Sequence, residues 1–350
     1  MKKNIIAMAV AAAVAAPAAA MADTTMYGKI HASFDVYDGD TMEDRDYGLA
    51  SNSSRIGFKG KEDISDSLAF IWQFENTVDW ADGAGWGGQR NTFVGFSGDW
   101  GTAIAGRHDT PFKGVSRKYD LFGDTVGDSR ALLNSKGGTG TPEGWDLRTN
   151  NTVAYVTPDM GGFSAKAAYV TDWDLNDEDG DSIPGGNNNE WDAYSLSAGY
   201  SVGGFMIDAA YEQHNAGDLG DETGMRVGAG YKMGGIKVVG LYQTTEDLAG
   251  DDQDIWGLGA GYTFGKNTIK AQYYTADDRD NNADTAADLW AVGYDYKLSK
   301  QTTVYAAYGS VEGDGAGNQQ IGSGTGKGVD GDVFIGEDSN SLSVGLVHKF

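Results

Sequence analysis

The chain has 350 residues, no cysteine and a formal net charge of −25. Without cysteine, neither a disulfide framework nor a thiolate metal site can form, and so acidic a protein will not bind nucleic acid through a broad basic face. The 53 glycines show no three-residue period, which excludes collagen, and the 18 tyrosines, 13 phenylalanines and 9 tryptophans argue against glycine-rich disorder.

The first residues have the pattern of a secretory signal peptide. Lys2 and Lys3 precede an alanine-rich apolar run over 5–16, and an Ala-Met-Ala cleavage pattern follows. A membrane anchor helix is the alternative, but the run is short and is followed at once by proline. We predict that residues 1–22 are removed and that one domain over 23–350 remains, at a charge of −27 because the two signal lysines are lost.

Apolar and polar residues alternate with period two along most of the domain, which predicts β-strands with one apolar and one polar or small face. Met26 to Val36 and Trp256 to Phe264 are examples, with aromatic residues near the strand ends. About ten residues per strand suits a tilted strand that crosses a bilayer. The predicted strands are 24–37, 51–60, 68–78, 90–98, 101–108, 148–157, 163–171, 190–201, 205–214, 224–233, 236–245, 254–264, 268–276, 287–297, 302–310 and 340–350.

Short and long connections alternate between these strands. Asp159 to Gly162 and Val202 to Gly204 are short, whereas 38–52, 79–89 and 171–189 are long. Turns at one end and loops at the other are typical of an outer-membrane barrel, and only helices or closed barrels pair every backbone group in hydrocarbon. We therefore predict an all-β fold, a sixteen-stranded antiparallel transmembrane β-barrel without a second domain.

The segment from Gly106 to Arg130 follows the fifth strand and is too polar and too rich in glycine and aspartate to continue it. A loop of this length inside a compact domain is usually functional or disordered. We predict that it folds inward and narrows the lumen of the barrel.

Several segments in order resemble the trimeric, sixteen-stranded general-diffusion porins of Gram-negative outer membranes. The matching pieces are MYGK from Met26, SSRIGFKGKEDISDSLAFIWQFE from Ser53, FVGFSGDWGTAIAGR from Phe93, KYDLFGDT from Lys118, NNTVAYVTPDMGGFSAKAAYV from Asn150, and the terminal SLSVGLVHKF. The terminal Phe350 resembles the family's signal to the barrel-assembly machinery. The resemblance implies a homotrimer embedded in outer-membrane lipid and lipopolysaccharide.

The same resemblance implies a pore constriction, in which carboxylates of the inward loop face a ladder of bases on the opposite wall. It places this ladder at Lys29, Arg55, Arg90 and Arg148. The alternation independently puts Lys29 and Arg55 on polar strand faces. Arg90 and Arg148 fit the same face if Phe93, Val153 and Tyr155 face lipid, and Arg107 falls on it as well.

The acids of the loop have a different sequence from the enterobacterial pattern and are closer to neisserial forms. Asp120, Asp124 and Asp128 are the candidates to face the ladder. For each of them the alternative is a structural role, in which the carboxylate pairs with Arg117 or Lys118 and fixes the loop.

An acidic outer loop contains Asp177, Asp179 and Asp181 at alternate positions, as in calcium-binding loops. It lacks the complete EF-hand pattern, so a solvated loop is the preferred interpretation, with Ca²⁺ or Mg²⁺ bridging to lipopolysaccharide phosphates as the alternative. No cofactor is predicted, and the four histidines form no ligand set.

These features predict a passive, weakly cation-selective channel for small hydrophilic solutes in the cell outer membrane, and not an enzyme. A barrel enzyme would need a nucleophile beside a partnered histidine, and no such signature surrounds His31, His108, His214 or His348. A substrate-specific porin and a plugged structural or adhesive barrel remain as alternatives.

Overall fold

The computed structural model describes residues 24–39, 45–81, 83, 85–134, 144–171, 191–216, 220–246, 252–280, 285–313 and 338–350. The predicted signal peptide over 1–22 and the candidate ion ligands Asp177, Asp179 and Asp181 lie outside these ranges.

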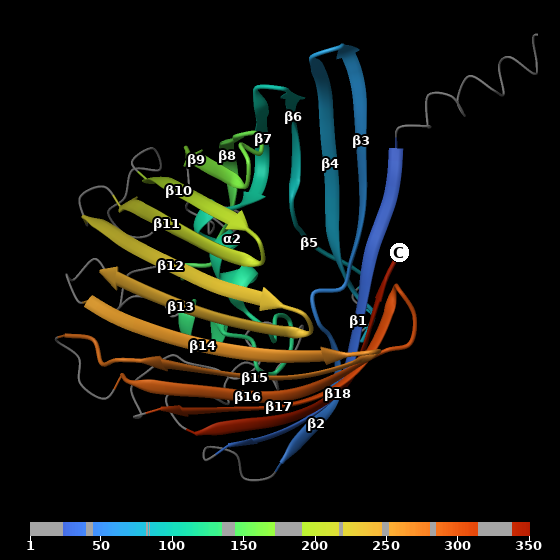
Figure 1. The fold of residues 1–350 in the computed structure, drawn as a ribbon, viewed down its shortest axis with the longest axis vertical. Helices are drawn as coiled ribbons and strands as arrows, with labels where there is room; N and C mark the ends of the chain where they lie inside the picture. The colour runs from blue at the N-terminus through green and yellow to red at the C-terminus, as the bar shows by residue number, and fades with distance from the viewer. Residues whose placement is uncertain are drawn as a thin grey trace, which may run out of the picture.

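Antiparallel strands pair in chain order, and the last strand pairs with the first, so the sheet closes into a barrel (Figure 1). The strands are β1 (Thr24–Gly39), β2 (Asp46–Ser51), β3 (Arg55–Ser65), β4 (Leu68–Asp79), β5 (Gly85–Gln89), β6 (Thr92–Gly98), β7 (Gly101–Asp109), β8 (Arg148–Val156), β9 (Phe163–Val170), β10 (Trp191–Val202), β11 (Phe205–Ala216), β12 (Asp221–Met233), β13 (Ile236–Glu246), β14 (Asp252–Phe264), β15 (Asn267–Ala276), β16 (Ala287–Lys297), β17 (Thr302–Gly313) and β18 (Ser339–Lys349). Closure leaves no sheet edge, so the backbone groups of every strand find partners.

In the described part of the chain, the 18 strand segments make sixteen barrel strands. β2 and β3 pair one after the other with β1, and β5 and β6 pair in the same way with β4. The prediction of sixteen strands is thus confirmed. The prediction that segments 46–51 and 85–89 are parts of loops is wrong, because each of them extends an interrupted strand.

The two faces of the strands differ as the alternation predicts. In β1 the outward Met26, Ile30 and Phe34 are exposed, whereas the intervening Lys29 and His31 are buried on the inner side. At the end with short turns, outward aromatic residues such as Phe205 and Tyr231 pair across neighbouring strands. This arrangement matches the aromatic girdle of a membrane barrel.

The chain between β7 and β8 folds into the barrel, as predicted, and forms two helices that the sequence did not indicate. α2 (Pro111–Tyr119) lies inside the barrel against β9 to β13 (Figure 1). α3 (Arg130–Leu133) lies against β15 and β16. Thr110 caps α2 by accepting a hydrogen bond from the Lys113 amide at 3.3 Å, and Pro111 occupies the first turn, where its missing N–H is not needed. Among the described residues, no helix is long and apolar enough to cross a membrane.

Candidate functional site

The inward segment rests on glycines of the barrel wall. A Cβ atom on Gly228 of β12 would overlap the ring of Tyr119, and one on Gly293 of β16 would lie 2.8 Å from the Phe122 ring. On β17, a Cβ on Gly309 would lie 2.6 Å from the Val126 carbonyl oxygen. The missing side chains therefore provide the space in which the segment packs against the wall.

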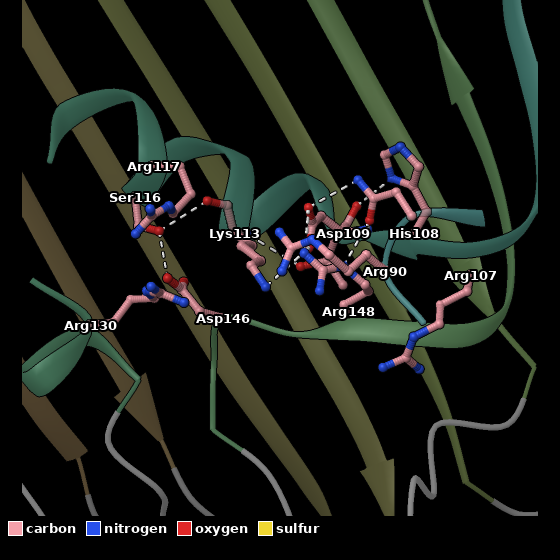
Figure 2. A network of polar contacts seen from close by, with 12 residues as sticks. Arg90, Arg107, His108, Asp109, Lys113, Ser116, Arg117, Arg130, Asp146 and Arg148 are labelled. Carbon is pink, nitrogen blue, oxygen red and sulfur yellow. Dashed lines mark hydrogen bonds and ion pairs between the residues drawn. The ribbon is translucent and has the colours of Figure 1, made fainter. Parts of the chain in front are cut away.

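A fully buried arginine ties the two legs of the inward segment to the wall. The Nη1 of Arg226, on β12, donates to Asp146 at 2.8 Å and to the carbonyl of Phe112 at 3.0 Å, and its Nε donates to Gln243 at 2.9 Å. The guanidinium also lies over the Phe112 ring, 4.1 Å from the centroid. Asp146 accepts a second hydrogen bond from Ser116 at 2.7 Å (Figure 2). In the sequence this anchor is a single arginine between inward glycines, and the sequence analysis did not identify it.

The tip of the segment reaches the opposite wall. Asp124 accepts from Lys29 Nζ at 2.6 Å, and it also pairs with Arg117 at 3.1 Å and Arg130 at 3.2 Å. Burial alone would raise the pKa of Asp124, but the charges of these three bases lower it below its ordinary value. Of the three candidate acids, only Asp124 forms an ion pair with a predicted ladder residue.

Asp128 and Asp120 are buried and hold the segment's own conformation. Asp128 pairs with Arg117 at 2.9 Å and Arg130 at 2.8 Å, which lower its pKa although burial opposes them. Asp120 accepts from the Phe122 amide at 2.8 Å and from Gln272 at 3.0 Å. Burial raises the pKa of Asp120 to about 7, the charge of Asp128 adds to this shift, and Arg117 opposes it. Asp120 and Asp128 therefore have the geometry expected of carboxylates that fix the loop and do not face the ladder.

The bases of the ladder lie on β1, β3 and β8 and at the break between β5 and β6, and acids that the sequence analysis missed lie among them. Arg55 and Arg90 approach the same carboxylate, Glu75 of β4, at 3.8 and 2.7 Å. Arg148 pairs with Asp109 at 3.0 Å. Glu75 lies in the inward register of its strand, which could have identified it.

Asp109 links the ladder to the helix of the inward segment. It lies 3.0 Å from Lys113 on α2 as well as from Arg148 on β8, so one carboxylate joins the two elements (Figure 2). Neither Asp109 nor Lys113 was a candidate in the sequence analysis.

Two side-chain directions differ from expectation. Phe93 does not face lipid: it pairs with the inward Gln73, and its ring lies 5.4 Å from that of His108, while Val94 is the exposed neighbour. The break between β5 and β6 changes the alternation, so that Arg90 and Phe93 are both inward. Arg107 points away from the ladder (Figure 2). Its Nη1 donates to the Asn150 side chain at 2.7 Å.

Bases outnumber acids among the described groups at this site, even when Asp120 is counted with the acids. Glu75, Asp109, Asp124 and Asp128 each contact at least two bases. The bases are Lys29, Arg55, Arg90, Lys113, Arg117, Arg130 and Arg148. The site therefore carries a local positive excess inside an acidic protein.

Within the described ranges, no group of three or more His, Cys, Asp or Glu side chains is placed to hold a metal ion. The weak metal candidates Asp177, Asp179 and Asp181 are outside these ranges, so their interpretation stays a prediction.

A family model described as Gram-negative porin matches residues 7–316. The chain is 33% identical over 178 residues to outer membrane porin protein 32 of Delftia acidovorans, covering 49% of this chain and 50% of that protein. It is 32% identical over 227 residues to the major outer membrane protein P.IB of a Neisseria meningitidis strain, covering 61% and 60%. The aligned part thus spans about half to three-fifths of these relatives.

Solved structures are similar over nearly the whole chain. The anion-selective porin from Comamonas acidovorans matches with a TM-score of 0.76 at 25% identity, covering 93% of this chain and 99% of that chain. OmpT of Vibrio cholerae in a trimer form matches with a TM-score of 0.65 at 21% identity, again over 93% and 99%, which shows the fold alone.

Proposed function

Because this chain belongs to the Gram-negative porin family, and so to the outer membrane, we propose that it is a passive diffusion channel for small hydrophilic solutes and ions. The supporting observation is that the inward segment lies against one side of the lumen while charged groups beside it keep solvent access. The side chains of Arg55, Asp109 and Arg117 are 27%, 28% and 29% exposed. Water can therefore reach this charged region.

The proposed constriction consists of the ladder Lys29, Arg55, Arg90 and Arg148 with Asp124 as its facing acid. At separations of a few ångströms and beside low-dielectric walls, these charges act more strongly than charges on outer loops. Since bases are in excess there, we propose that the constriction favours anions. The similarity to the anion-selective porin from Comamonas acidovorans, at 25% identity, supports this proposal.

Weak cation selectivity, expected from the sequence, is the second candidate. It is favoured by the formal net charge of −25, which raises the cation concentration near the pore mouths. Charges farther away than ~10 Å are screened at 0.1 M salt, so this effect belongs to low ionic strength. The two candidates predict reversal potentials of opposite sign, and only the cation selectivity should be lost as the salt concentration rises.

Single-channel recording with reversal potentials in a salt gradient tests both statements. We expect stepwise openings and an anion-selective reversal potential at moderate salt. Replacing Arg55 and Arg90 by glutamine should shift the potential towards cations, and Asp124→Asn should shift it towards anions. A barrel without conductance would contradict the channel and support a plugged structural barrel.

Two other readings are tested on the same purified protein. A substrate-specific porin would show saturable block of the current by one class of solute and not by others of equal size. A barrel enzyme would hydrolyse lipid or peptide substrates, and we expect no turnover in either assay.

We also propose a homotrimer. Phe34 of β1 and Val344 of β18 pair with each other across the barrel closure and are 46% and 58% exposed on the outer wall. In a trimer they would pack against neighbouring barrels. Unheated detergent samples should then migrate as trimers and dissociate on boiling, whereas a monomer by light scattering in mild detergent would contradict the proposal.

Contacts with the membrane surroundings are proposals of the same kind. We propose that Phe350 directs barrel assembly, so that its deletion lowers the folded fraction in outer membranes.

We also propose that Asp177, Asp179 and Asp181 hold Ca²⁺ or Mg²⁺ between the protein and lipopolysaccharide. A melting curve that is unchanged by a chelator would contradict the ion site.

A further inference from the structure

A cavity of about 340 Å³ lies in the lumen between the start of α2 and the inner faces of β6 to β9. Thr102 and Val156 line it, and both are close to the short turns that join β6 to β7 and β8 to β9. Short turns mark the periplasmic end of such barrels. The cavity therefore extends from Asp109, beside the proposed constriction, towards the periplasmic end of the barrel.

The wall of this cavity is more apolar than a water-filled pore requires. Ile71, Phe93, Ile104 and Val156 project from four different strands into it. Elsewhere on the inner wall, large aliphatic side chains such as Leu289 are covered by the inward segment and fully buried. Here Ile71, Phe93 and Val156 are only half-buried, so an apolar group that entered would remove further apolar surface from water.

One lysine at the cavity has a charge that no described acid neutralises. Lys166 of β9 lines the cavity, and its Nζ lies 3.9 Å from the position that a Cβ on Gly114 of α2 would take. No ion pair of Lys166 occurs among the described residues, although the neighbouring Lys113 and Arg117 both have carboxylate partners. Lys166 is therefore available to an anion from solution.

The acid at the same cavity does not cancel this charge. Asp109 lies 3.0 Å from both Lys113 and Arg148, so its carboxylate is already shared by two bases. A dissolved anion near Lys166 would therefore contact a surface that is apolar on one side and cationic on the other. Such a surface favours solutes that carry both an apolar part and a negative charge.

We propose that this cavity is a binding site for amphipathic monoanions, carboxylates with an apolar body, on their way through the pore. The carboxylate pairs with Lys166 Nζ, and the apolar body lies on Ile71, Phe93, Ile104 and Val156. The proposal rests on the proposed channel function, since the solute reaches the site through the lumen. A bound carboxylate fills part of the lumen beside the proposed constriction, so the chloride current falls while the site is occupied.

The test uses the full trimer in planar bilayers and measures block of the chloride current by butanoate, hexanoate and octanoate. Full burial of each added methylene contributes about 0.8 kcal/mol, or about a fourfold change in affinity, so we expect the blocking constant to fall two- to fourfold per methylene. Hexan-1-ol, which has the chain but not the charge, should block at least about twofold more weakly than hexanoate.

Two variants separate the charged and apolar contributions. Lys166→Gln should weaken the block by all three acids by a similar factor, about two- to fivefold. Ile71→Ser should reduce the dependence on chain length and change butanoate block least. Lys59→Gln is the matched control, because Lys59 is also a lumen-facing lysine without a carboxylate partner in the described residues and lies over Tyr27, 5.2 Å from its ring centroid. It should change none of these constants.

The outcomes distinguish this site from the channel itself. Equal block by the three acids, or block unchanged in Lys166→Gln and Ile71→Ser, would overturn the site while the chloride current still supported the channel. Absence of chloride current in the wild type would overturn the channel function. A loss of block in Lys59→Gln as large as in Lys166→Gln would show a general charge effect and would also overturn the site.

Discussion

The two sides of the lumen are built from the same alternating strands but are filled in opposite ways. On β12, β14, β16 and β17 the inward positions include glycines, and the inward segment packs on them with Tyr119, Leu121, Phe122 and Val126. On β1, β3 and β8 the inward positions hold Lys29, Arg55 and Arg148 instead. One side is a packed interior, and the other is a charged wall on which Arg55 is 27% exposed.

This difference shows that the inward residues of a barrel strand have two separate tasks. Small inward residues allow another part of the chain to approach the backbone closely and exclude water. Long charged residues contact the neighbouring chain through the ends of their side chains, as Lys29 does with Asp124. The same substitution should therefore have different consequences on the two sides.

The largest difference in stability between the two sides is expected for substitutions of arginine. Arg226→Met removes the partner of the buried Asp146 and should lower the free energy of unfolding by about 3–5 kcal/mol. Arg55→Met, on the charged wall at 27% exposure, should cost below about 1 kcal/mol. Urea titration followed by tryptophan fluorescence measures both. Adding Asp146→Asn should restore part of the loss, and equal effects of the two arginine variants would contradict the contrast.

Glycine provides a second contrast on the packed side. A Cβ on Gly228 overlaps Tyr119, so Gly228→Ala should cost about 1–3 kcal/mol and loosen the inward segment. On β14, the Cβ of Gly261→Ala would meet nothing closer than 3.7 Å, and this variant should stay within about 0.5 kcal/mol of the wild type. Thermal melting and the size limit for sugars measure the two effects. A wider pore in Gly261→Ala would be inconsistent with the packing assignment.

The pH dependence of stability should come from Asp120, on the packed side of the lumen. The pKa of Asp120 is raised to about 7, so its protonated form is favoured in the folded state. Its contribution to stability is complete below its ordinary pKa of about 4 and is lost as the pH rises through 7. Asp120→Asn should therefore raise the melting temperature at pH 8 and leave it nearly unchanged at pH 4. A larger gain at pH 4 than at pH 8 would contradict the sign.

The smallest effect on the reversal potential is expected for the acidic loop that the sequence predicts at the outer end of the barrel. Asp177→Asn with Asp179→Asn should move the reversal potential by a few millivolts at most at 0.1 M salt, because the screening length is about 10 Å there. Asp124→Asn, which removes the partner of Lys29, should move it further and should keep part of its effect at 1 M salt. A larger shift from the outer pair would show that the constriction does not set the selectivity.

The sequence by itself determined the barrel. Period-two alternation, strand length and the alternation of short and long connections are local properties, and they predicted sixteen strands and the inward segment after the fifth. Where the local pattern was interrupted, at 46–51 and 85–89, prediction missed the strand continuation. The helix α2 was also missed, because Thr110 and Pro111 were hidden in a stretch that was interpreted only as a polar loop.

Only the tertiary structure decided which charges meet. Lys29 and Asp124 are 95 positions apart, and Arg226 and Asp146 are 80 apart, so their pairing depends on the path of the inward segment across the barrel. That path is set by contacts that the alternation does not encode, chiefly the space left by inward glycines and the buried anchor at Arg226. The strands follow from local periodicity, whereas the constriction follows from how one segment fits the space that those strands enclose.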